Sequence, residues 1–492
     1  MRIKAILSLC LFTLATAVSA DEFIKINTDQ VGLVLRAADN GRLYQSYLGK
    51  RLANESDLQH LPKGNEAYLT HGMEDYFEPA IEVHHNDANP SSLLKYVSHT
   101  SKNVQPGVDE TVITLQDDKY PVTVKLHYVA YAKENIIKTF TEISHQEKKP
   151  LKLERYASAM LHFSRPAYYL TEFSGDWIYE ATMSTTPLNF GKKVLDTKLG
   201  ARANMFTPPM FILSLDKESS ENEGEVILGT LGWTGNFRFT FEVDNKKDLR
   251  VIAGINPYFS EYSLPKGETF RTPDFYFTYS DCGRGQASRN FHDWARKYQL
   301  KDGQENRMTL LNNWEATYFD FNEKKILKIA KSAAKLGVDM LVLDDGWFGK
   351  RNSDTSGLGD WFVNENKLKG GLSMLADKIN DLGMKLGIWF EPEMVSEDSH
   401  LYRAHPDWAI AIPDRKPMRG RFQLVLDMSR REVQDYLFGA ISNILDNANI
   451  SYIKWDMNRS ISDLYSHALP AERQGELSHR YVLGLYSLLE RL

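Results

Sequence analysis

The spacing of apolar residues changes once along this chain, near residue 281, and this change limits the possible folds more than any other feature. Before it, apolar and polar side chains mostly alternate, as in Val122–Tyr128 and Phe237–Val243. Such alternation is typical of antiparallel strands with one buried face. Because turn residues separate many segments of this kind, we predict a large antiparallel β-sandwich for this part of the chain.

After residue 306, short apolar runs alternate with amphipathic segments of helical period. We predict strands at 309–314, 340–344, 385–390 and 451–456, and helices at 323–336, 372–382, 430–445 and 479–492, with a further helix near 286–298 linking the two parts. Asn322 is the predicted N-cap of the first of the four helices, and Ser429 with Glu432 forms a predicted capping box before the third. Repeated strand–helix units imply a parallel sheet, either doubly wound or a TIM-type barrel.

The N-terminus has the pattern of a secretory signal peptide. Arg2 and Lys4 precede an apolar run that ends near Val18, and Ala20 is a small residue at the expected cleavage position. A buried N-terminal helix is the alternative, whereas the run is too short for a membrane anchor. We predict export to the periplasm or the medium, with residues 1–20 removed and no membrane attachment afterwards. Without Cys10, Cys282 has no partner for an intramolecular disulfide.

Charge and motif content exclude several classes of function. Lys and Arg number 59 against 65 Asp and Glu, a net charge of −6, so no nucleic-acid partner is expected. Neither a phosphate-binding glycine motif nor a Gly-x-Ser-x-Gly elbow is present in the sequence, and no cofactor is predicted.

Polar residues collect where the predicted parallel strands end, which is where barrels of this type place their active sites. On the last strand, Lys454 and Asp456 share one face, so Lys454 is expected to keep Asp456 ionised. An ionised carboxylate there can attack an acetal carbon, as retaining glycosidases require, although a purely structural ion pair is the alternative. Neighbouring tryptophans suit a sugar ring.

A metal site is a weaker interpretation of the same region. Asp344 and Asp345, together with Glu391 and Glu393, offer the oxygen ligands that hard divalent cations prefer. Adjacent strand residues point to opposite faces, however, and no histidine assists them. We therefore predict no bound metal.

Five segments in a fixed order resemble the bacterial α-galactosidases of glycoside hydrolase family 36. They are Asn312–Ala316, Leu343–Gly349, Trp389–Val395, Gly420–Asp427 and Lys454–Arg459. The resemblance implies an N-terminal antiparallel β-supersandwich with a linking helix over residues 21–305. It also implies a (β/α)8 TIM-type barrel from residue 306 to residue 492. That second part is shorter than the roughly 250 residues of a whole barrel, so we expect its first half only, a barrel incomplete in this chain.

The resemblance also implies an activity and its residues. The expected reaction is the retaining hydrolysis of terminal α-galactosyl residues of melibiose, raffinose or galactomannan side chains, with Asp456 as nucleophile. Asp344 and Asp345 would bind O4 and O6 of galactose. Further sugar contacts are implied for Lys454, Asn458 and Arg421, and aromatic walls for Trp314, Trp389 and Trp177. The family also suggests a homo-oligomer, a tetramer.

One expected residue is missing from the pattern. The family's general acid/base is an aspartate on a later strand. In this sequence the only aspartate after Asp456 is Asp463, which is expected on the loop that leaves the same strand. We therefore predict that this chain lacks the acid/base. Two alternatives remain: an α-glucosidase-like hydrolase or galactosyl transferase on the same scaffold, and a non-catalytic sugar-binding protein.

Overall fold

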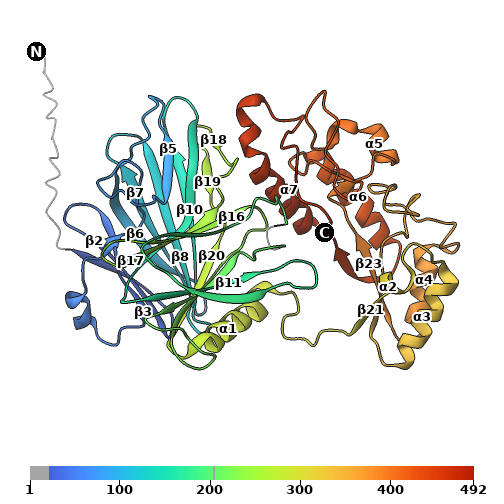
Figure 1. The fold of residues 1–492 in the computed structure, drawn as a ribbon, viewed down its shortest axis with the longest axis horizontal. Helices are drawn as coiled ribbons and strands as arrows, with labels where there is room; N and C mark the ends of the chain where they lie inside the picture. Colours follow the sequence, from blue (N-terminus) through green and yellow to red (C-terminus); the bar gives the residue numbers. More distant parts are fainter. Residues whose placement is uncertain (1–20, 203–204) are drawn as a thin grey trace, which may run out of the picture.

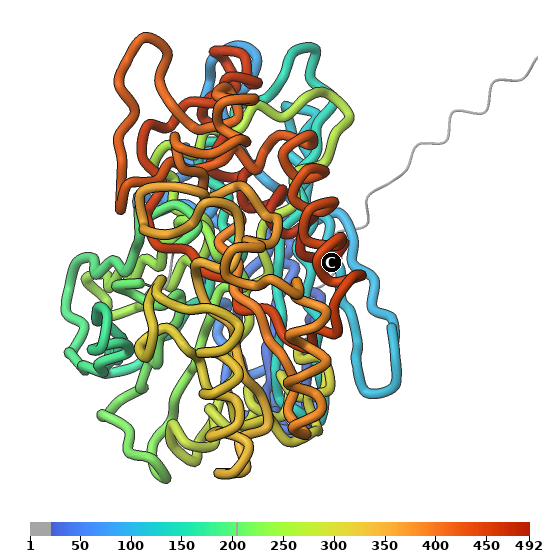
Figure 2. The backbone as a smooth tube through the Cα atoms, turned by 90° about the vertical axis from the view of Figure 1, so that its right-hand side faces the viewer, coloured from blue at the N-terminus to red at the C-terminus, as the bar shows by residue number. Residues whose placement is uncertain are grey.

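The computed structural model describes residues 21–202 and 205–492, which form a β-rich N-terminal part and an α/β C-terminal part (Figure 1). The predicted signal peptide, residues 1–20, lies outside the described residues. Figure 2 views the molecule from the side of the α/β part, whose helices lie in front of the β-rich part. Among the helices of the described part, none has the length and apolar character needed to cross a membrane.

Antiparallel sheets build the β-rich part, which confirms the predicted β-sandwich. The largest sheet has the order β12-β11-β14-β15-β20-β9-β8-β7-β6, with β19 on β9, and a second has the order β13-β16-β17-β10-β18, with β5 on β10. A four-stranded sheet, β1-β2-β3-β4, precedes them. The strands are β1 (Glu22–Asn27), β2 (Val31–Ala37), β3 (Leu43–Lys50), β4 (Asn65–Glu66), β5 (Ile81–His84), β6 (Leu94–Gln105), β7 (Val108–Asp117), β8 (Val122–Tyr131), β9 (Ile136–His145), β10 (Leu151–Ser164), β11 (Tyr168–Ser174), β12 (Thr182–Pro187), β13 (Gly191–Asp196), β14 (Met210–Leu215), β15 (Glu225–Leu231), β16 (Phe237–Val243), β17 (Asp248–Ile255), β18 (Tyr262–Leu264), β19 (Thr269–Arg271) and β20 (Phe275–Ser280).

Aromatic side chains fill the core between the two larger sheets. The Phe211 ring of β14 lies 4.9 Å from that of Phe241 and 5.3 Å from that of Phe239, both on β16, in edge-to-face contacts. Gly229 of β15 leaves room for these rings, since a Cβ there would lie 2.7 Å from both Phe211 and Phe275. The alternation seen in the sequence therefore corresponds to inward-facing strand residues of two packed sheets.

The α/β part contains a four-stranded parallel sheet in the order β21-β22-β23-β26. This order follows the chain without reversal, unlike the order of a doubly wound sheet, which reverses at a switch point. Its strands are β21 (Leu310–Asn312), β22 (Met340–Leu343), β23 (Lys385–Phe390) and β26 (Ile450–Trp455); its longer helices are α3 (Glu323–Lys335), α4 (Gly371–Asn380), α6 (Arg431–Asp446) and α7 (Leu477–Arg491). Helix α1 (Gly283–Trp294), continued by η2 (Ala295–Gln299), connects the two parts.

Short elements decorate the loops of this part. They are α2 (Trp314–Thr317), β24 (Met394–Val395), α5 (His400–Ala404), η3 (Pro406–Trp408), β25 (Leu424–Val425) and η4 (Ala471–Glu476). The β-rich part contains one short helix of this kind, η1 (Glu55–His60). The antiparallel pair β24 and β25 joins the loops that follow β23 and precede α6.

One predicted helix cap is confirmed and one is wrong. The Asn322 side chain accepts from the Lys325 amide, as expected for the N-cap of α3. The Ser429–Glu432 capping box does not form, since α6 begins after Arg430 without a side-chain cap. The Ser429 hydroxyl instead donates to the Asp427 carboxylate at 2.5 Å, a charged acceptor that is stronger than a backbone partner.

Loops of the β-rich part meet the α/β part through an aromatic stack and hydrogen bonds. His479 of α7 stacks on Trp233 with ring centroids 5.4 Å apart, and the Tyr486 hydroxyl accepts from the Thr234 amide at 2.9 Å. The Ile461 amide also donates to the Leu199 carbonyl at 3.1 Å. These contacts hold loops of the β-rich part against α7 and against the loop that follows β26.

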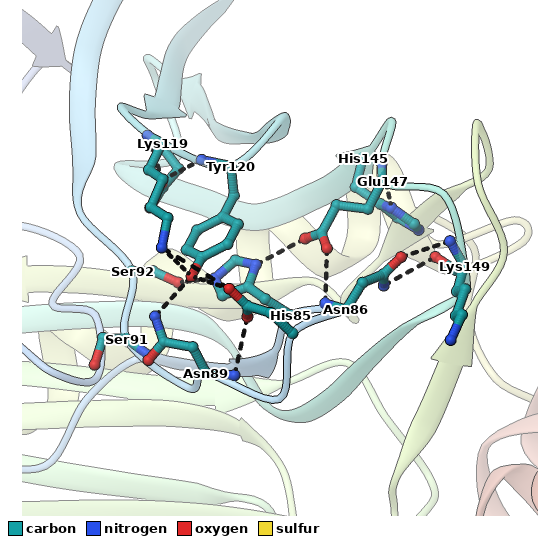
Figure 3. A network of polar contacts seen from close by, with 12 residues as sticks. His85, Asn86, Asn89, Ser91, Ser92, Lys119, Tyr120, His145, Glu147 and Lys149 are labelled. Carbon is teal, nitrogen blue, oxygen red and sulfur yellow. Dashed lines mark hydrogen bonds and ion pairs between the residues drawn. The ribbon is translucent and has the colours of Figure 1, made fainter.

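A buried row of polar side chains joins three loops in the β-rich part (Figure 3). His85 Nδ1 lies 2.7 Å from Glu147 Oε1, and His85 Nε2 lies 2.9 Å from the Ser92 hydroxyl. Although this is the order of a Ser–His–Glu hydrolase triad, the His85 side chain is fully buried and stacks on Tyr120 at 3.5 Å, closed to any substrate. The row therefore holds loops together.

We expect His85→Ala to lower the free energy of unfolding by about 2–4 kcal/mol, because it leaves Oε1 of the buried Glu147 carboxylate without its partner, while Oε2 keeps the Asn86 amide. Chemical denaturation would measure the change. His60→Ala, at an exposed histidine, is the matched control and should change stability by less than about 0.5 kcal/mol. Equal stabilities of the two variants would contradict this role.

Candidate active site

A cavity of about 550 Å³ opens at the carboxyl ends of the parallel strands. It brings together all nine side chains that the family resemblance implies for catalysis and sugar binding, from segments up to 281 residues apart. These are Trp177, Trp314, Asp344, Asp345, Trp389, Arg421, Lys454, Asp456 and Asn458. Their roles stay predictions, but their convergence on one cavity is a property of the fold.

The cavity also contains residues that sequence reasoning missed. Arg202 and Met205 reach it from the β-rich part, alongside Trp177. No local sequence signal marks them, because they lie on a loop whose approach depends on how the two parts pack.

Asp344 is held at the end of β22 by a set of hydrogen bonds. Its Oδ2 accepts from Lys454 Nζ at 2.8 Å and from the Asn312 side-chain amide, and its Oδ1 accepts from the Asp345 amide at 2.8 Å. Asp344 is nearly fully buried, so the Lys454 ammonium compensates its charge where water cannot.

This arrangement corrects the expectation that Lys454 pairs with Asp456. The long lysine side chain crosses the intervening strand β23 and meets the carboxylate that follows β22. Neutral donors serve Asp456 instead: its Oδ2 accepts from Trp389 Nε1 at 3.0 Å and from Asn458 Nδ2 at 2.7 Å. The shared face of Lys454 and Asp456 did not specify which carboxylate the lysine would reach.

Asn458 connects this carboxylate to the loop before β25. Its Oδ1 accepts from Arg421 at 2.5 Å. Arg421 and Phe422 both adopt positive φ, at 52° and 64°, a conformation that costs free energy for residues other than glycine. The loop is thus held in a strained conformation that directs Arg421 into the cavity.

Asp345 has a guanidinium partner of its own. Arg351 donates to both carboxylate oxygens, from Nε at 3.0 and 3.2 Å and from Nη2 at 2.9 Å. Burial raises the pKa of the Asp345 carboxyl, and the hydrogen bonds from Arg351 oppose that rise. The pair presents a fixed acceptor at the cavity wall.

Two further glutamates lie behind the cavity. Glu391 Oε1 accepts from the backbone amide of Asn458 at 2.6 Å and from Gln423 Nε2 at 2.7 Å. Glu393 accepts from Trp455 Nε1 at 3.1 Å and from the Tyr481 hydroxyl at 2.6 Å. Both carboxyls are thus occupied by protein donors. Over residues 21–202 and 205–492, no group of three His, Cys, Asp or Glu side chains is placed to hold a metal ion.

The environment of Glu391 makes stability depend on pH. Burial, and next the charge of Asp456, raise the pKa of this carboxyl from 4.5 to about 7. The folded state therefore favours the protonated form, and stability that is present below about pH 4.5 is lost as the pH rises to about 7. We expect Glu391→Gln to gain up to about 3 kcal/mol relative to the unchanged protein over this interval.

Unfolding measured at a series of pH values tests this expectation. Glu365→Gln, at an exposed glutamate, should track the unchanged protein throughout. A constant difference between Glu391→Gln and the unchanged protein would contradict the shifted ionisation.

Comparisons with known proteins match both parts of the chain. The family model described as glycosyl hydrolase family 36 N-terminal domain matches residues 39–265, and the Melibiase model matches residues 269–492. Alpha-galactosidase AgaA of Geobacillus stearothermophilus is 40% identical over 87% of this chain. Alpha-galactosidase Mel36A of Lactobacillus acidophilus is 35% identical over 95% of this chain and 69% of its own length. In this sequence alignment, the chain spans 60% of the length of AgaA.

Solved structures agree with these matches. The crystal structure of AgaA superposes with a TM-score of 0.91 at 36% identity, covering 96% of this chain and 70% of AgaA. A variant of AgaA in complex with raffinose gives a TM-score of 0.92 at 35% identity, with the same coverage of both chains.

Proposed function

This chain belongs to glycoside hydrolase family 36, and we propose that it acts on terminal α-galactosyl residues of oligosaccharides such as melibiose, raffinose and galactomannan side chains. One observation carries the proposal: Asp456, Asp344 and Asp345 line one cavity together with the aromatic walls Trp177, Trp314 and Trp389. Variants of the relative AgaA have been solved with raffinose and with stachyose, which supports this class of substrate.

In the proposed double displacement, Asp456 attacks the anomeric carbon as the bond to the leaving oxygen breaks. Trp389 and Asn458 hold one oxygen of the Asp456 carboxylate, which leaves the other oxygen free of these two donors and available for attack. Water then adds to the anomeric carbon and breaks its bond to Asp456, which releases galactose, restores the carboxylate and returns one proton to the solvent. The leaving oxygen needs a proton when it departs as an alcohol.

Asp463 lies outside the cavity in which that proton is needed. Asp463 is the aspartate that follows Asp456, and its carboxylate accepts from the Met418 amide at 2.6 Å rather than lining the cavity. Tests of Asp456 are therefore designed with leaving groups that depart readily without protonation.

Selectivity for galactose would come from Asp344. An axial O4 can donate to this carboxylate, whereas the equatorial O4 of glucose leaves the buried acceptor unpaired. We expect p-nitrophenyl α-galactoside to exceed the α-glucoside by about 10³-fold or more in kcat/KM. Comparable rates would favour an α-glucosidase-like enzyme, and galactose binding in calorimetry without any turnover would favour a sugar-binding protein.

The wider architecture and location are part of the proposal. We propose that β21, β22, β23 and β26 are barrel strands, which their order supports and which the resemblance to family 36 implies. We also propose export after removal of residues 1–20, on the signal-peptide pattern alone. A mature N-terminus at Asp21, read by sequencing, tests this. The tetramer implied by the family stays a prediction.

A further inference from the structure

Three consecutive residues at the end of β23 each hold the segment that carries Asp456. Trp389 Nε1 donates to Asp456 Oδ2 at 3.0 Å, and the Phe390 carbonyl accepts from the Asp456 amide at 2.8 Å. Glu391 Oε1 then accepts from the backbone amide of Asn458 at 2.6 Å. The backbone on both sides of Met457 is thus tied to β23.

The third of these contacts acts on Asp456 through Asn458. Glu391 fixes the Asn458 backbone, and the Asn458 side chain donates to Asp456 Oδ2 at 2.7 Å. Gln423 Nε2, at 2.7 Å from the same Glu391 oxygen, adds the strand pair β24–β25 to the network. Glu391 is 1% exposed and lies outside the residues that line the cavity, so it meets protein groups rather than a sugar.

We infer that Glu391 is a positioning residue for the nucleophile: its carboxylate sets Asn458 and, through it, the attacking carboxylate of Asp456, and its own charge assists the reaction from behind. This inference rests on the proposed function.

Charged groups from three parts of the fold act on Glu391. Asp456 faces it from the end of β26, Arg351 from the loop after β22, and Arg202 from the β-rich part, while Gln423 and Asn458 are neutral. Burial and the Asp456 charge raise the pKa of Glu391 to about 7. Above this pH a second negative charge stands behind the nucleophile and stabilises the positive charge that develops on the sugar ring.

Two substitutions separate the two parts of this inference. Glu391→Gln keeps a carbonyl acceptor for Asn458 and removes the charge, whereas Glu391→Met removes both. Glu393→Gln is the matched control, since Glu393 is the neighbouring buried glutamate and bonds Trp455 and Tyr481 instead of Asn458. The substrate is α-galactosyl fluoride, because fluoride departs without a proton donor.

For Glu391→Met we expect kcat to fall by about 100-fold, with KM within about threefold of the unchanged protein, because the cavity walls stay in place while the nucleophile loses its alignment. For Glu391→Gln we expect a loss of about 10-fold at about pH 8.5 and a smaller loss at about pH 5.5, so that its kcat relative to the unchanged protein falls as the pH passes about 7. Glu393→Gln should show a relative kcat that does not depend on pH.

A kcat of Glu391→Met within about threefold of the unchanged protein, or a Glu391→Gln ratio that stays constant with pH, would overturn the inference. Glu391→Gln keeps the test decisive if the methionine variant does not fold. Absence of fluoride release by the unchanged protein would be a different result, since it would overturn the proposed function and this inference together.

Discussion

Replacing Asp456 with alanine is expected to lower the rate of α-galactosyl transfer from p-nitrophenyl α-galactoside by about 10⁴-fold or more, because the substitution removes the carboxylate proposed to form the galactosyl ester. KM should change less, since Asp344, Asp345 and the tryptophans still shape the cavity. Release of p-nitrophenolate measures the loss. Asp463→Ala, on the same loop but outside the cavity lining, is the matched control and should retain most of the activity.

Azide gives this experiment a second readout. In Asp456→Ala, azide can enter the space left by the carboxylate and attack the anomeric carbon as p-nitrophenolate departs. The expected product is β-galactosyl azide, because attack comes from the face opposite the leaving group. Formation of α-galactosyl azide, or turnover unaffected by the substitution, would show that Asp456 is not the nucleophile.

Asp344→Asn is expected to reduce kcat/KM for the α-galactoside by about 10²–10³-fold, and to reduce the preference over the α-glucoside by a similar factor. The amide keeps the shape of the side chain but removes the charge that Lys454 neutralises at 2.8 Å. Steady-state rates on both p-nitrophenyl sugars measure the effect. Asp339→Asn, at the exposed opposite end of β22, is the control and should leave selectivity unchanged.

Lys454→Met tests whether the two residues act as one unit. If the Asp344–Lys454 pair is the functional element, the double variant should lose little more activity than either single variant. Fully additive losses, or a glucoside preference that survives Asp344→Asn, would assign galactose selection to other groups.

Many helices and strands of the α/β part could be predicted from local sequence patterns. The strand predicted at 385–390 is β23 with the same bounds, and Asn322 caps α3 as predicted. A buried parallel strand needs a continuous apolar run, and a helix start needs an acceptor for free amides, so both leave marks within a few residues. The Ser429 prediction was wrong because Asp427, two residues away, is the better acceptor for its hydroxyl.

The sequence by itself determined the antiparallel β part, the repeated strand–helix units and nine of the residues that line the cavity, since hydrophobic period and short motifs are local properties. Only the tertiary structure decided which side chains around the cavity form hydrogen bonds and ion pairs with one another. Lys454 meets Asp344 and not Asp456, Arg202 enters from the β-rich part, and Glu391 supports Asn458. These pairings depend on which strands are neighbours, on their register and on how the two parts pack, and such distances between remote segments exist only in the folded chain.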